Sequence, residues 1–387
     1  MAKQKKYWTP DEILKTKPTY AMVLGEKGNG KSYAVKMYVL KQFFEKGEKF
    51  ALFRTFKEDL KNLSEYFEDM HLDEKGNRRI RELSGGEWDR IKVYRQEIYL
   101  VRDEEVTKKR IVDYDDNGKP VYDFYTDTVE VTGPQCGRAF WVSLSGYNNT
   151  SSRAFVGYRW GIFEEFLTEY WQEENITTTF QKMVSTIYRD NDATIFMLGN
   201  RVTRINPFFK DWGLEAALTQ KPGTIDTYDI EEYDEGTDRN YTVRISVESC
   251  PLAGSASSMI FGTVKKSING NHYDVKQNAA ILYSYNEKFV CVYELLVEYT
   301  GLTYDMKLLN HKETGAQVVR VSPWKGSHNV LRKISNKFSI DPLTTSNFNV
   351  KIKAEVKIQE LIACGKICYS DALTANEFPQ VLESIGV

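Results

Sequence analysis

Residues 25 to 32 are the part of this chain whose types and spacing point most directly to chemistry. They form a complete G-x-x-x-x-G-K-S pattern. In this pattern the glycines let backbone N–H groups close around phosphates, the lysine reaches the terminal phosphates, and the serine hydroxyl ligates Mg²⁺. The pattern therefore predicts an ATP-type nucleotide with Mg²⁺, bound by Gly25, Glu26, Lys27, Gly28, Asn29, Gly30, Lys31 and Ser32.

The elements on either side of this pattern fit a phosphate-binding loop. Tyr20 to Leu24 is a short apolar run that ends at Gly25, which is typical of a buried parallel strand. After the loop, apolar residues recur at helical spacing up to a stop at Gly47; they are Tyr33, Met37, Leu40 and Phe44. We expect a strand, a loop and a helix in that order.

Hydrolysis of a bound nucleotide needs acidic groups that the loop itself does not supply. One carboxylate must lie near the Mg²⁺ and another must polarise the attacking water. Trp160 to Phe163 predicts a short strand that ends in Glu164 and Glu165. Beside the strand of the phosphate-binding loop, Glu164 would face the metal and Glu165 the water. Alternatively, both are solvated acids that open the following helix.

Two further polar residues are candidates for the same site. The apolar run "ATIFMLGN" predicts a strand ending at Asn200, which could sense the γ-phosphate or position water, or could simply belong to a turn. Arg189 follows a predicted helix at the edge of the nucleotide-binding region. Its residue type suits transition-state neutralisation, although an isolated arginine in such a place is usually a surface residue.

Several segments together resemble a known family. The segments "VLGEKGNGKSYAVKMYVLKQF", "FRTFKEDLKNLSEYFED", "FEEF", "TIYRDND" and "LGNRVTRINPFF" are similar to the DNA-packaging ATPases of small podophages with linear, protein-primed genomes. The likeness covers roughly residues 19–70 and 138–212. It implies a homomeric ring, with a pentamer expected, that docks in the host cytoplasm at the portal of a prohead and drives double-stranded DNA inward. A packaging RNA is a further possible partner.

The resemblance also assigns roles to individual residues. Lys31 and Ser32 match the phosphate and Mg²⁺ residues, while Glu164 stands where relatives generally have Asp. Glu165 matches the catalytic glutamate, and Arg189 matches an arginine that acts on the neighbouring subunit's nucleotide. Arg54 and Lys57 fall in a matching basic block, where they could contact DNA or the adjacent subunit. The alternative is an exposed helix start with Leu60, Leu63 and Phe67 turned inward.

The pattern along the chain predicts an α/β protein of two domains. Residues 1–215 would form a P-loop ATPase domain of the additional-strand class, in which 71–137 alternate apolar and polar residues and predict a β-hairpin insertion. The acid-rich stretch 216–242 would be a linker. Residues 243–387 would form a small α/β domain with helices near 330–338 and 350–364, which the resemblance relates to an RNase H-like nuclease.

The C-terminal region leaves its own function open. Its scattered acids could supply a two-metal site, but no spacing singles out a triad among Asp274, Glu294, Glu298, Asp305, Asp341 and Asp371. We favour a non-cutting domain that binds DNA, the portal or RNA. Its candidate basic contacts are Lys265, Lys266, Lys333, Lys337, Lys351 and Lys353. Alternatively, these lysines are only solvated surface residues. A terminase with an active nuclease and a nucleotide-switched DNA-binding assembly factor remain as alternatives.

Composition sets the remaining limits. The chain has 387 residues, 41% of them hydrophobic, and a formal net charge of −2. This charge argues against a protein that coats nucleic acid through electrostatic attraction alone. No apolar run reaches the roughly 18 residues that cross a bilayer, and we expect a cytoplasmic protein without a membrane partner. The cysteines lack zinc-site spacing, and Cys364 and Cys368 would share a helix face in a reduced packing role.

Overall fold

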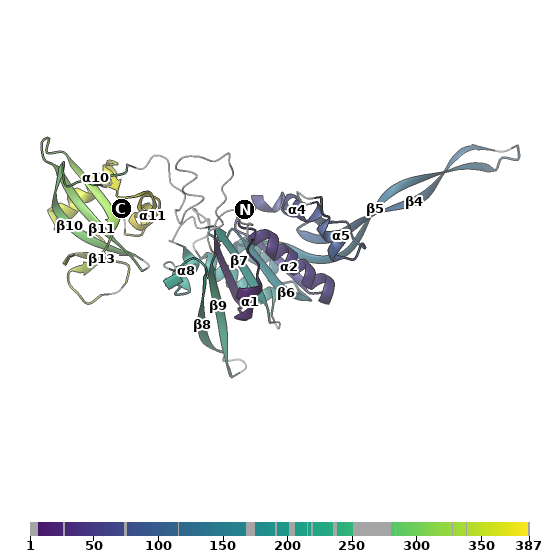
Figure 1. The fold of residues 1–387 in the computed structure, drawn as a ribbon, viewed down its shortest axis with the longest axis horizontal. Coiled ribbons are helices and arrows are strands. Elements are labelled where there is room, and N and C mark those ends of the chain that lie inside the picture. The colour runs from purple at the N-terminus through teal and green to yellow at the C-terminus, as the bar shows by residue number, and fades with distance from the viewer. Residues whose placement is uncertain are drawn as a thin grey trace, which may run out of the picture.

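The computed structural model describes all of the chain except residues 1–6, 26–27, 73–75, 115, 168–174, 190–191, 201–205, 215, 218–219, 235–237, 251–279, 283, 300, 327, 338 and 386–387. Two β-sheets organise the described residues, and a long two-stranded ribbon extends away from the first of them (Figure 1). The protein is therefore a mixed α/β protein, as the sequence predicts.

The first sheet has the strand order β3-β4-β5-β2-β6-β7-β1-β9-β8. Its strands are β1 (Tyr20–Gly25), β2 (Lys49–Arg54), β3 (Arg90–Tyr94), β4 (Glu97–Tyr114), β5 (Pro120–Trp141), β6 (Tyr158–Glu164), β7 (Thr194–Asn200), β8 (Thr224–Asp234) and β9 (Arg239–Ser249). The helices associated with it are α1 (Asp11–Lys15), α2 (Lys31–Lys46), α3 (Leu63–Tyr66), α4 (Glu68–His71), α5 (Arg79–Leu83), α6 (Leu144–Thr150), α7 (Ile176–Ile187) and α8 (Pro207–Asp211), with a 3₁₀ turn at Glu58–Leu60.

The centre of this sheet is parallel and buried on both faces. Strand β1 pairs in parallel with β7, β7 with β6, and β6 with β2. Every residue of β1 is buried, which explains its continuous apolar sequence. Alternate residues face opposite layers: Met22 packs with helices α7 and α8, whereas Val23 packs with α1, α2 and the short helices after β2.

The order of these strands corrects one expectation. The acidic strand β6 was expected beside the strand of the phosphate-binding loop, but β7 lies between β6 and β1. Because the strands are parallel, their carboxyl ends still meet at one edge of the sheet, where β1 ends at Gly25, β6 at Glu164 and β7 at Asn200. The helix predicted after the loop forms as α2 and ends at Gly47, whose φ of 73° suits glycine.

Strands β4 and β5 form a long antiparallel hairpin, in the region where the sequence alternates apolar and polar residues. The carboxyl end of β5 returns to the sheet, where Gly137 to Trp141 pair in parallel with Phe50 to Arg54 of β2. This gives the insertion a rigid base on the parallel core.

The acid-rich stretch expected to be a linker is instead part of the first sheet. Strands β8 and β9 pair with each other, and β9 continues the sheet beyond β1. The sequence interpretation gave weight to charge and overlooked the alternation: Tyr228 and Ile230 pack against the core, while Asp229 on the other face pairs with Arg244 at 2.7 Å. Charged residues are common on an edge strand such as β8 because they discourage further strand pairing. The first sheet therefore extends to residue 249, well past the expected boundary at 215.

The second sheet has the order β14-β13-β10-β11-β12-β15. Strands β10 (Phe289–Tyr299), β11 (Leu302–His311) and β12 (Gln317–Pro323) form an antiparallel meander, with parallel additions by β13 (Lys333–Ser335), β14 (Thr344–Thr345) and β15 (Ile367–Tyr369). Helices α10 (Lys353–Ala363) and α11 (Ala372–Ser384) complete its core.

Two expectations for this region are wrong and two lie outside the described residues. The helix expected near 330–338 is absent, because Lys333–Ser335 pairs with β10 as β13. Cys364 and Cys368 do not share a helix, since α10 ends at Ala363 and Cys368 belongs to β15. All five cysteines are free. The candidate lysines Lys265 and Lys266 and the candidate acid Asp274 fall among residues that the structure does not describe.

No helix within the described residues is long and apolar enough to span a membrane.

Candidate active site

The glycines of the phosphate-binding loop hold conformations that other residues would not adopt easily. Gly28 and Gly30 have φ of 80° and 86°, in the left-handed region that favours glycine. A Cβ on Gly25 would lie 2.5 Å from Nδ2 of Asn29 and 2.9 Å from Cβ of Cys250. The loop thus brings its backbone close to its neighbours at the start of α2, while Glu26 and Lys27, also predicted to bind the nucleotide, lie outside the described residues.

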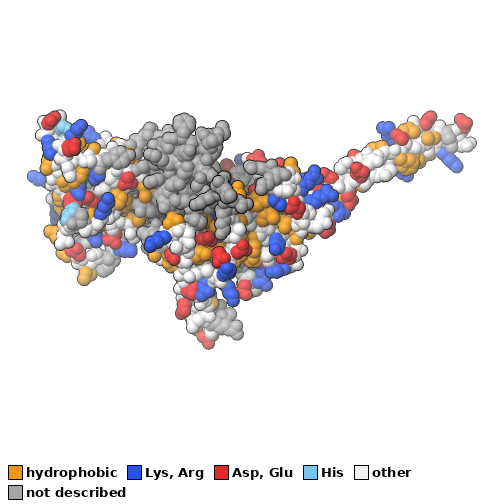
Figure 2. All heavy atoms as spheres, in the orientation of Figure 1, with side chains coloured by type: hydrophobic (Ala, Val, Ile, Leu, Met, Phe, Trp, Pro, Cys, Tyr) orange, Lys and Arg blue, Asp and Glu red, His pale blue; other side chains and the backbone are white. Residues whose placement is uncertain are grey.

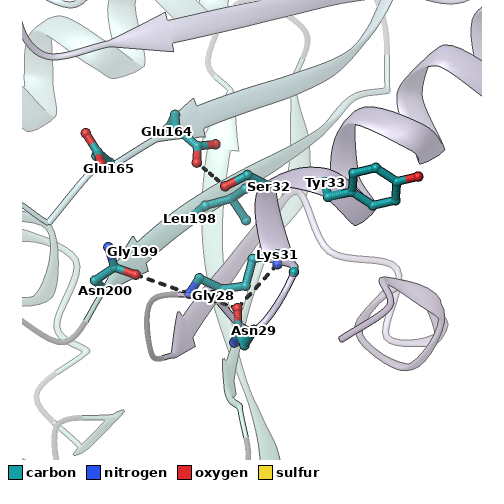
Figure 3. Close-up of a pocket in the computed structure, with 11 residues that line it drawn as sticks. Gly28, Asn29, Lys31, Ser32, Tyr33, Glu164, Glu165, Leu198, Gly199 and Asn200 are labelled. Atoms are coloured by element: carbon teal, nitrogen blue, oxygen red, sulfur yellow. Dashed lines mark hydrogen bonds between the residues drawn. The ribbon is translucent and has the colours of Figure 1, made fainter. Parts of the chain in front are cut away.

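The positively charged side chain of Lys31 lines a cavity of about 250 Å³ at the start of this helix. Its side chain is buried, and Nζ donates hydrogen bonds to the side-chain oxygens of Asn29 at 3.1 Å and Asn200 at 3.3 Å (Figure 3). A buried ammonium at the amino terminus of a 16-residue helix is a favourable environment for a phosphate. Asn200 reaches the lysine because β7 pairs directly with β1, with Asn200 opposite Gly25.

Ser32 and Glu164 meet on the other side of the cavity. The hydroxyl of Ser32 donates to Oε1 of Glu164, and the hydroxyl of Tyr66 donates to Oε2 at 3.1 Å (Figure 3 shows the serine contact). Glu164 is buried, and burial raises its pKa, although Ser32, Arg54, Tyr66 and Lys36 oppose that rise. A hydroxyl and a carboxylate in contact are hard oxygen donors of the kind that Mg²⁺ prefers, so these residues fit the metal that the sequence predicts.

Glu165 sits at the rim of the same cavity in a strained backbone conformation. Its φ of 53° is unusual for a residue with a side chain and costs roughly 1–2 kcal/mol. The turn directs Glu164 inward and leaves the Glu165 side chain 63% exposed, 3.8 Å from the guanidinium of Arg54. A carboxylate at the rim of a phosphate-binding cavity is placed to accept a proton from water.

The structure separates the two basic candidates that follow β2. Arg54 is largely buried, and its guanidinium faces Asp59 at 3.3 Å as well as Glu165. Because the guanidinium of Arg54 is directed toward these two acids, its position does not support the expected contact with DNA or another subunit. Lys57 is exposed and lies over the ring of Trp141, 5.5 Å from its centroid. Lys57 therefore remains a candidate for an external contact.

Arg189 lies apart from the other predicted residues. It is exposed after α7 and before β7, and Asp192 of the same connection accepts a hydrogen bond from Arg159 near the start of β6. This is the amino-terminal edge of the parallel strands, opposite the edge that holds Lys31 and Glu164. Arg189 therefore does not line the cavity of its own chain.

Sequence reasoning missed two residues of the site. Tyr66 holds Glu164, and Lys36 donates to the carbonyl of Tyr66 and to Asp69, both at 2.6 Å. Burial lowers the pKa of Lys36, with Asp69 opposing that shift. Lys36 follows Ser32 by four positions and so shares its helix face, which is the signal that could have identified it.

In the second sheet, two of the predicted acids meet but a third does not join them. Lys307 contacts Glu294 at 2.7 Å and Asp305 at 2.5 Å. Burial, together with Glu294, raises the pKa of Asp305 to about 6 despite this lysine. His328 contacts Glu294 at 2.8 Å. Among the described residues no group of three or more His, Cys, Asp or Glu could hold a metal ion.

The other candidates of this region have structural contacts or remain on the surface. Glu298 pairs with Lys333 at 3.1 Å, Asp341 accepts from the backbone N–H of Leu343, and Asp371 caps α11. The exposed basic candidates that remain are Lys337, Lys351 and Lys353.

The chain is similar in sequence to phage DNA packaging proteins. Residues 1–80 match the family model of the podovirus DNA encapsidation protein (Gp16). The DNA packaging proteins of Bacillus phages PZA and phi29 are each 24% identical to this chain over 229 residues, which is 58% of this chain and 55% of theirs. The chain thus spans about half the length of the curated relatives it matches.

The resemblance to the podophage packaging proteins is therefore confirmed. The DNA packaging protein of Bacillus phage B103 is 44% identical over 48 residues, 12% of this chain and 15% of that protein. Among solved structures, the bacteriophage phi29 viral genome packaging motor assembly covers 98% of this chain and 99% of its own, with 16% identity and a TM-score of 0.48.

Proposed function

We propose that this protein is an ATP-driven motor that packages double-stranded DNA into a viral prohead. The observation that carries the proposal is the convergence of Lys31, Ser32, Glu164, Glu165 and Asn200 on one cavity at the carboxyl edge of a parallel sheet. The sequence relatives, which are DNA packaging proteins, supply the biological role.

The finer fold assignment belongs to the same proposal. One strand, β7, separates the strand of the phosphate-binding loop from the acidic strand β6, which supports an additional-strand ATPase domain. We assign this domain to the first sheet through residue 249, with the β4–β5 hairpin as its insertion. The second sheet is then the nuclease-derived, RNase H-like domain.

Each residue of the site has a distinct part in ATP hydrolysis. Lys31 binds the terminal phosphates, and Asn200 positions the lysine and the phosphate end. Ser32 and Glu164 would hold the Mg²⁺, which neutralises phosphate charge when bound. Glu165 accepts the proton of the attacking water, while Arg54 fixes the orientation of its carboxylate. Arg189, at the far edge of its own sheet, acts on the nucleotide of a neighbouring copy.

The proposed assembly is a homomeric ring, with five copies as the expected number, docked at the portal and assisted by a packaging RNA. The DNA passes through the ring, so each copy needs only a few basic contacts. Cutting is not part of the proposal, because the ammonium of Lys307 occupies the space between Glu294 and Asp305. Those carboxylates already have a cation.

The proposal is tested by ATP hydrolysis with and without double-stranded DNA, while the DNA is examined for cuts. We expect DNA-stimulated turnover that falls about 10²–10⁴-fold in Glu165→Gln, because a general base is lost. Glu313→Gln, a change in an exposed turn of the second sheet, is the matched control and should leave turnover unchanged. Nucleotide binding without any turnover would indicate a switch, and cleavage would indicate a terminase with an active nuclease.

A further inference from the structure

The hairpin of β4 and β5 extends far beyond the sheet that carries it. Among the described residues, residues 102–114 of β4 and 120–132 of β5 pair with no third strand; they pair with each other, except that Thr132 lies opposite Val101 of β4. We call this ribbon the arm. Thirteen residues per strand correspond to a length of about 43 Å. Figure 1 shows the arm leading away from the body of the protein. An isolated two-stranded ribbon is marginally stable in water, so an arm of this length needs a partner.

Large apolar side chains gather at the end of the arm. Exposed fractions of 40–67% are found for Ile111, Val112, Tyr114, Val121, Tyr122, Phe124 and Tyr125. We call these residues the arm tip. Figure 2 shows apolar side chains near the outer end of the ribbon, among charged ones. A cluster of exposed aromatic and branched residues marks an interaction surface, because scattered single residues would need no explanation but a contiguous set does.

The charge of the arm disfavours nucleic acid as its partner. Residues 102–132 contain nine acidic and five basic residues, a net charge of −4. Three of the basic residues already pair within the arm: Arg102 contacts Glu104, Lys108 contacts Asp127 at 2.5 Å and Arg110 contacts Asp123 at 2.9 Å. Because a net negative surface is repelled by phosphates, the arm tip fits a protein surface that is basic and aromatic.

The protein itself has such a surface at the base of the arm. A groove of about 880 Å³ is lined by the β3–β4 turn, the end of β5 and helix α6. Its charged residues are Lys57, Arg95, Arg138, Arg153 and Glu97, a net charge of +3. Its aromatic residues are Tyr94, Tyr99, Phe140, Trp141 and Phe155. The groove matches the arm tip both in charge and in apolar character.

Two residues of the turn that borders this groove have backbone conformations that are unfavourable for their residue types. Arg95 and Gln96 are the two central residues of the turn between β3 and β4, with φ of 50° and 69°. A two-residue hairpin turn in which both φ angles are positive favours Asn and Gly at these positions. The cost is of the order of 1 kcal/mol for each residue. Arg95 lies exposed over the ring of Tyr94, with its guanidinium 5.1 Å from the ring centroid. A long cationic side chain in a position that would suit asparagine indicates that the side chain itself has a function.

We propose that the arm tip of one copy binds in the groove of a second copy. The arm cannot fold back to its own groove, because it leads away from the body as a continuous ribbon (Figure 1). Its length of about 43 Å is close to the diameter of about 46 Å expected for a compact domain of roughly 250 residues. One arm therefore spans about one neighbour.

This contact is head-to-tail, since the arm and the groove are different surfaces of the same chain. Repetition of such a contact produces a closed ring when the rotation between neighbouring copies closes on itself. The inference rests only on the ring of the proposed function and names the surfaces that would hold it together. The contact between arm and groove does not involve the nucleotide, DNA or the catalytic residues. The contact can therefore be disproved while the motor proposal stands, and the motor proposal can be disproved while the contact stands.

The first test is self-association of the full chain without nucleotide or DNA, measured by sedimentation velocity. We expect concentration-dependent assembly of the wild type below about 100 μM. Phe124→Ser should weaken it at least about tenfold, because the change removes a central aromatic of the arm tip. Arg95→Asn should do the same while folding at least as well, since Asn tolerates the left-handed conformation. Ile340→Ser, at a side chain 91% exposed outside the arm and the groove, is the matched control.

The second test mixes the two kinds of variant. A chain with the defective arm tip keeps its groove, and a chain with the defective groove keeps its arm tip. Each should be a monomer alone, and their mixture should form dimers with one chain of each kind and nothing larger. Heat-unfolding curves of both variants confirm that they are folded.

Three results would overturn the inference. They are a wild type that stays monomeric throughout this concentration range, association that Phe124→Ser leaves unchanged, and a mixture without mixed dimers. If Arg95→Asn weakens binding of double-stranded DNA and has no effect on association, the groove is a nucleic-acid site instead.

Discussion

Tyr66 provides the sharpest test of how the carboxylate near the metal position is controlled. Its hydroxyl donates to Oε2 of Glu164 at 3.1 Å, and burial places the pKa of Glu164 above its ordinary value. Tyr66→Phe keeps the ring, which meets the Phe67 ring edge to face with centroids 4.9 Å apart and lies under Lys36. The change therefore removes one hydrogen bond and little else.

The size of the effect follows from that hydrogen bond. A hydrogen bond to a charged group contributes about 1.5–3 kcal/mol, and 3.1 Å is long for an O–H donor, so the lower end applies. Since about 1.4 kcal/mol corresponds to one pKa unit, the variant should raise the pKa of Glu164 by about one further unit. Metal binding requires the ionised carboxylate, so the gain in nucleotide affinity from Mg²⁺ should move to higher pH by the same amount.

The assay measures the affinity for a fluorescent ADP analogue with and without Mg²⁺ between about pH 5 and 8. The ratio of the two affinities should rise with pH in both proteins, with its midpoint about one unit higher in Tyr66→Phe. Tyr33→Phe is the matched control: Tyr33 lines the same cavity, but its hydroxyl accepts from Arg79 and does not contact Glu164. Equal midpoints in Tyr66→Phe and the wild type would refute this account of Glu164.

Four other substitutions, tested in three experiments, have expected outcomes. Arg189→Ala and Glu165→Gln chains should each lack ATP turnover, yet mixed rings should recover part of it if the arginine acts on a neighbour's nucleotide; no recovery in rings shown to be mixed would contradict that role. Glu355→Gln should lower the free energy of unfolding by about 3–5 kcal/mol in urea titrations, because it leaves the buried Arg332 guanidinium without its charge partner, now 2.7 Å away. Lys307→Met should create Mn²⁺ binding, detectable by calorimetry, because it removes the cation between two carboxylates; an absence of binding would show that those carboxylates cannot hold a metal.

The pH dependence of the Glu355 pair also has a definite sign. Burial raises the pKa of Glu355, but hydrogen bonds from Arg332, Asn349 and Tyr293 outweigh burial and lower it. Because the folded-state pKa is below the unfolded value, the stabilisation is present above about pH 4.5 and is lost as the pH falls through the folded-state pKa. The difference in stability between wild type and Glu355→Gln should therefore shrink in acid.

Local sequence patterns predicted the elements that carry the site. The apolar run at Tyr20, the glycine pattern after it and the helical spacing up to Gly47 correspond to β1, the loop and α2. These signals are local, since each depends on residues within one or two turns of chain. The same holds for the strands that end at Glu164 and Asn200.

What the sequence did not predict depends on pairing between distant segments. The order of β6, β7 and β1 is a tertiary property, and so is the addition of the acid-rich β8–β9 hairpin to the sheet. Tyr66 was not among the predicted site residues, because its partner Glu164 is 98 positions away along the chain. Likewise, nothing local to Arg54 distinguishes an arginine that faces DNA from one that faces Glu165.

The strand order also bears on the unusual glutamate at position 164. Because β7 separates β6 from β1, the acidic strand is two strand spacings, about 9–10 Å, from the strand of the phosphate-binding loop. The extra methylene of Glu, compared with Asp, lets its carboxylate contact the Ser32 hydroxyl directly. A metal entering between these two oxygens must replace that contact, and Tyr66 keeps the carboxylate in place while it does so. Glu164 is therefore compatible with a hydrolytic site, provided that the tyrosine is present to position it.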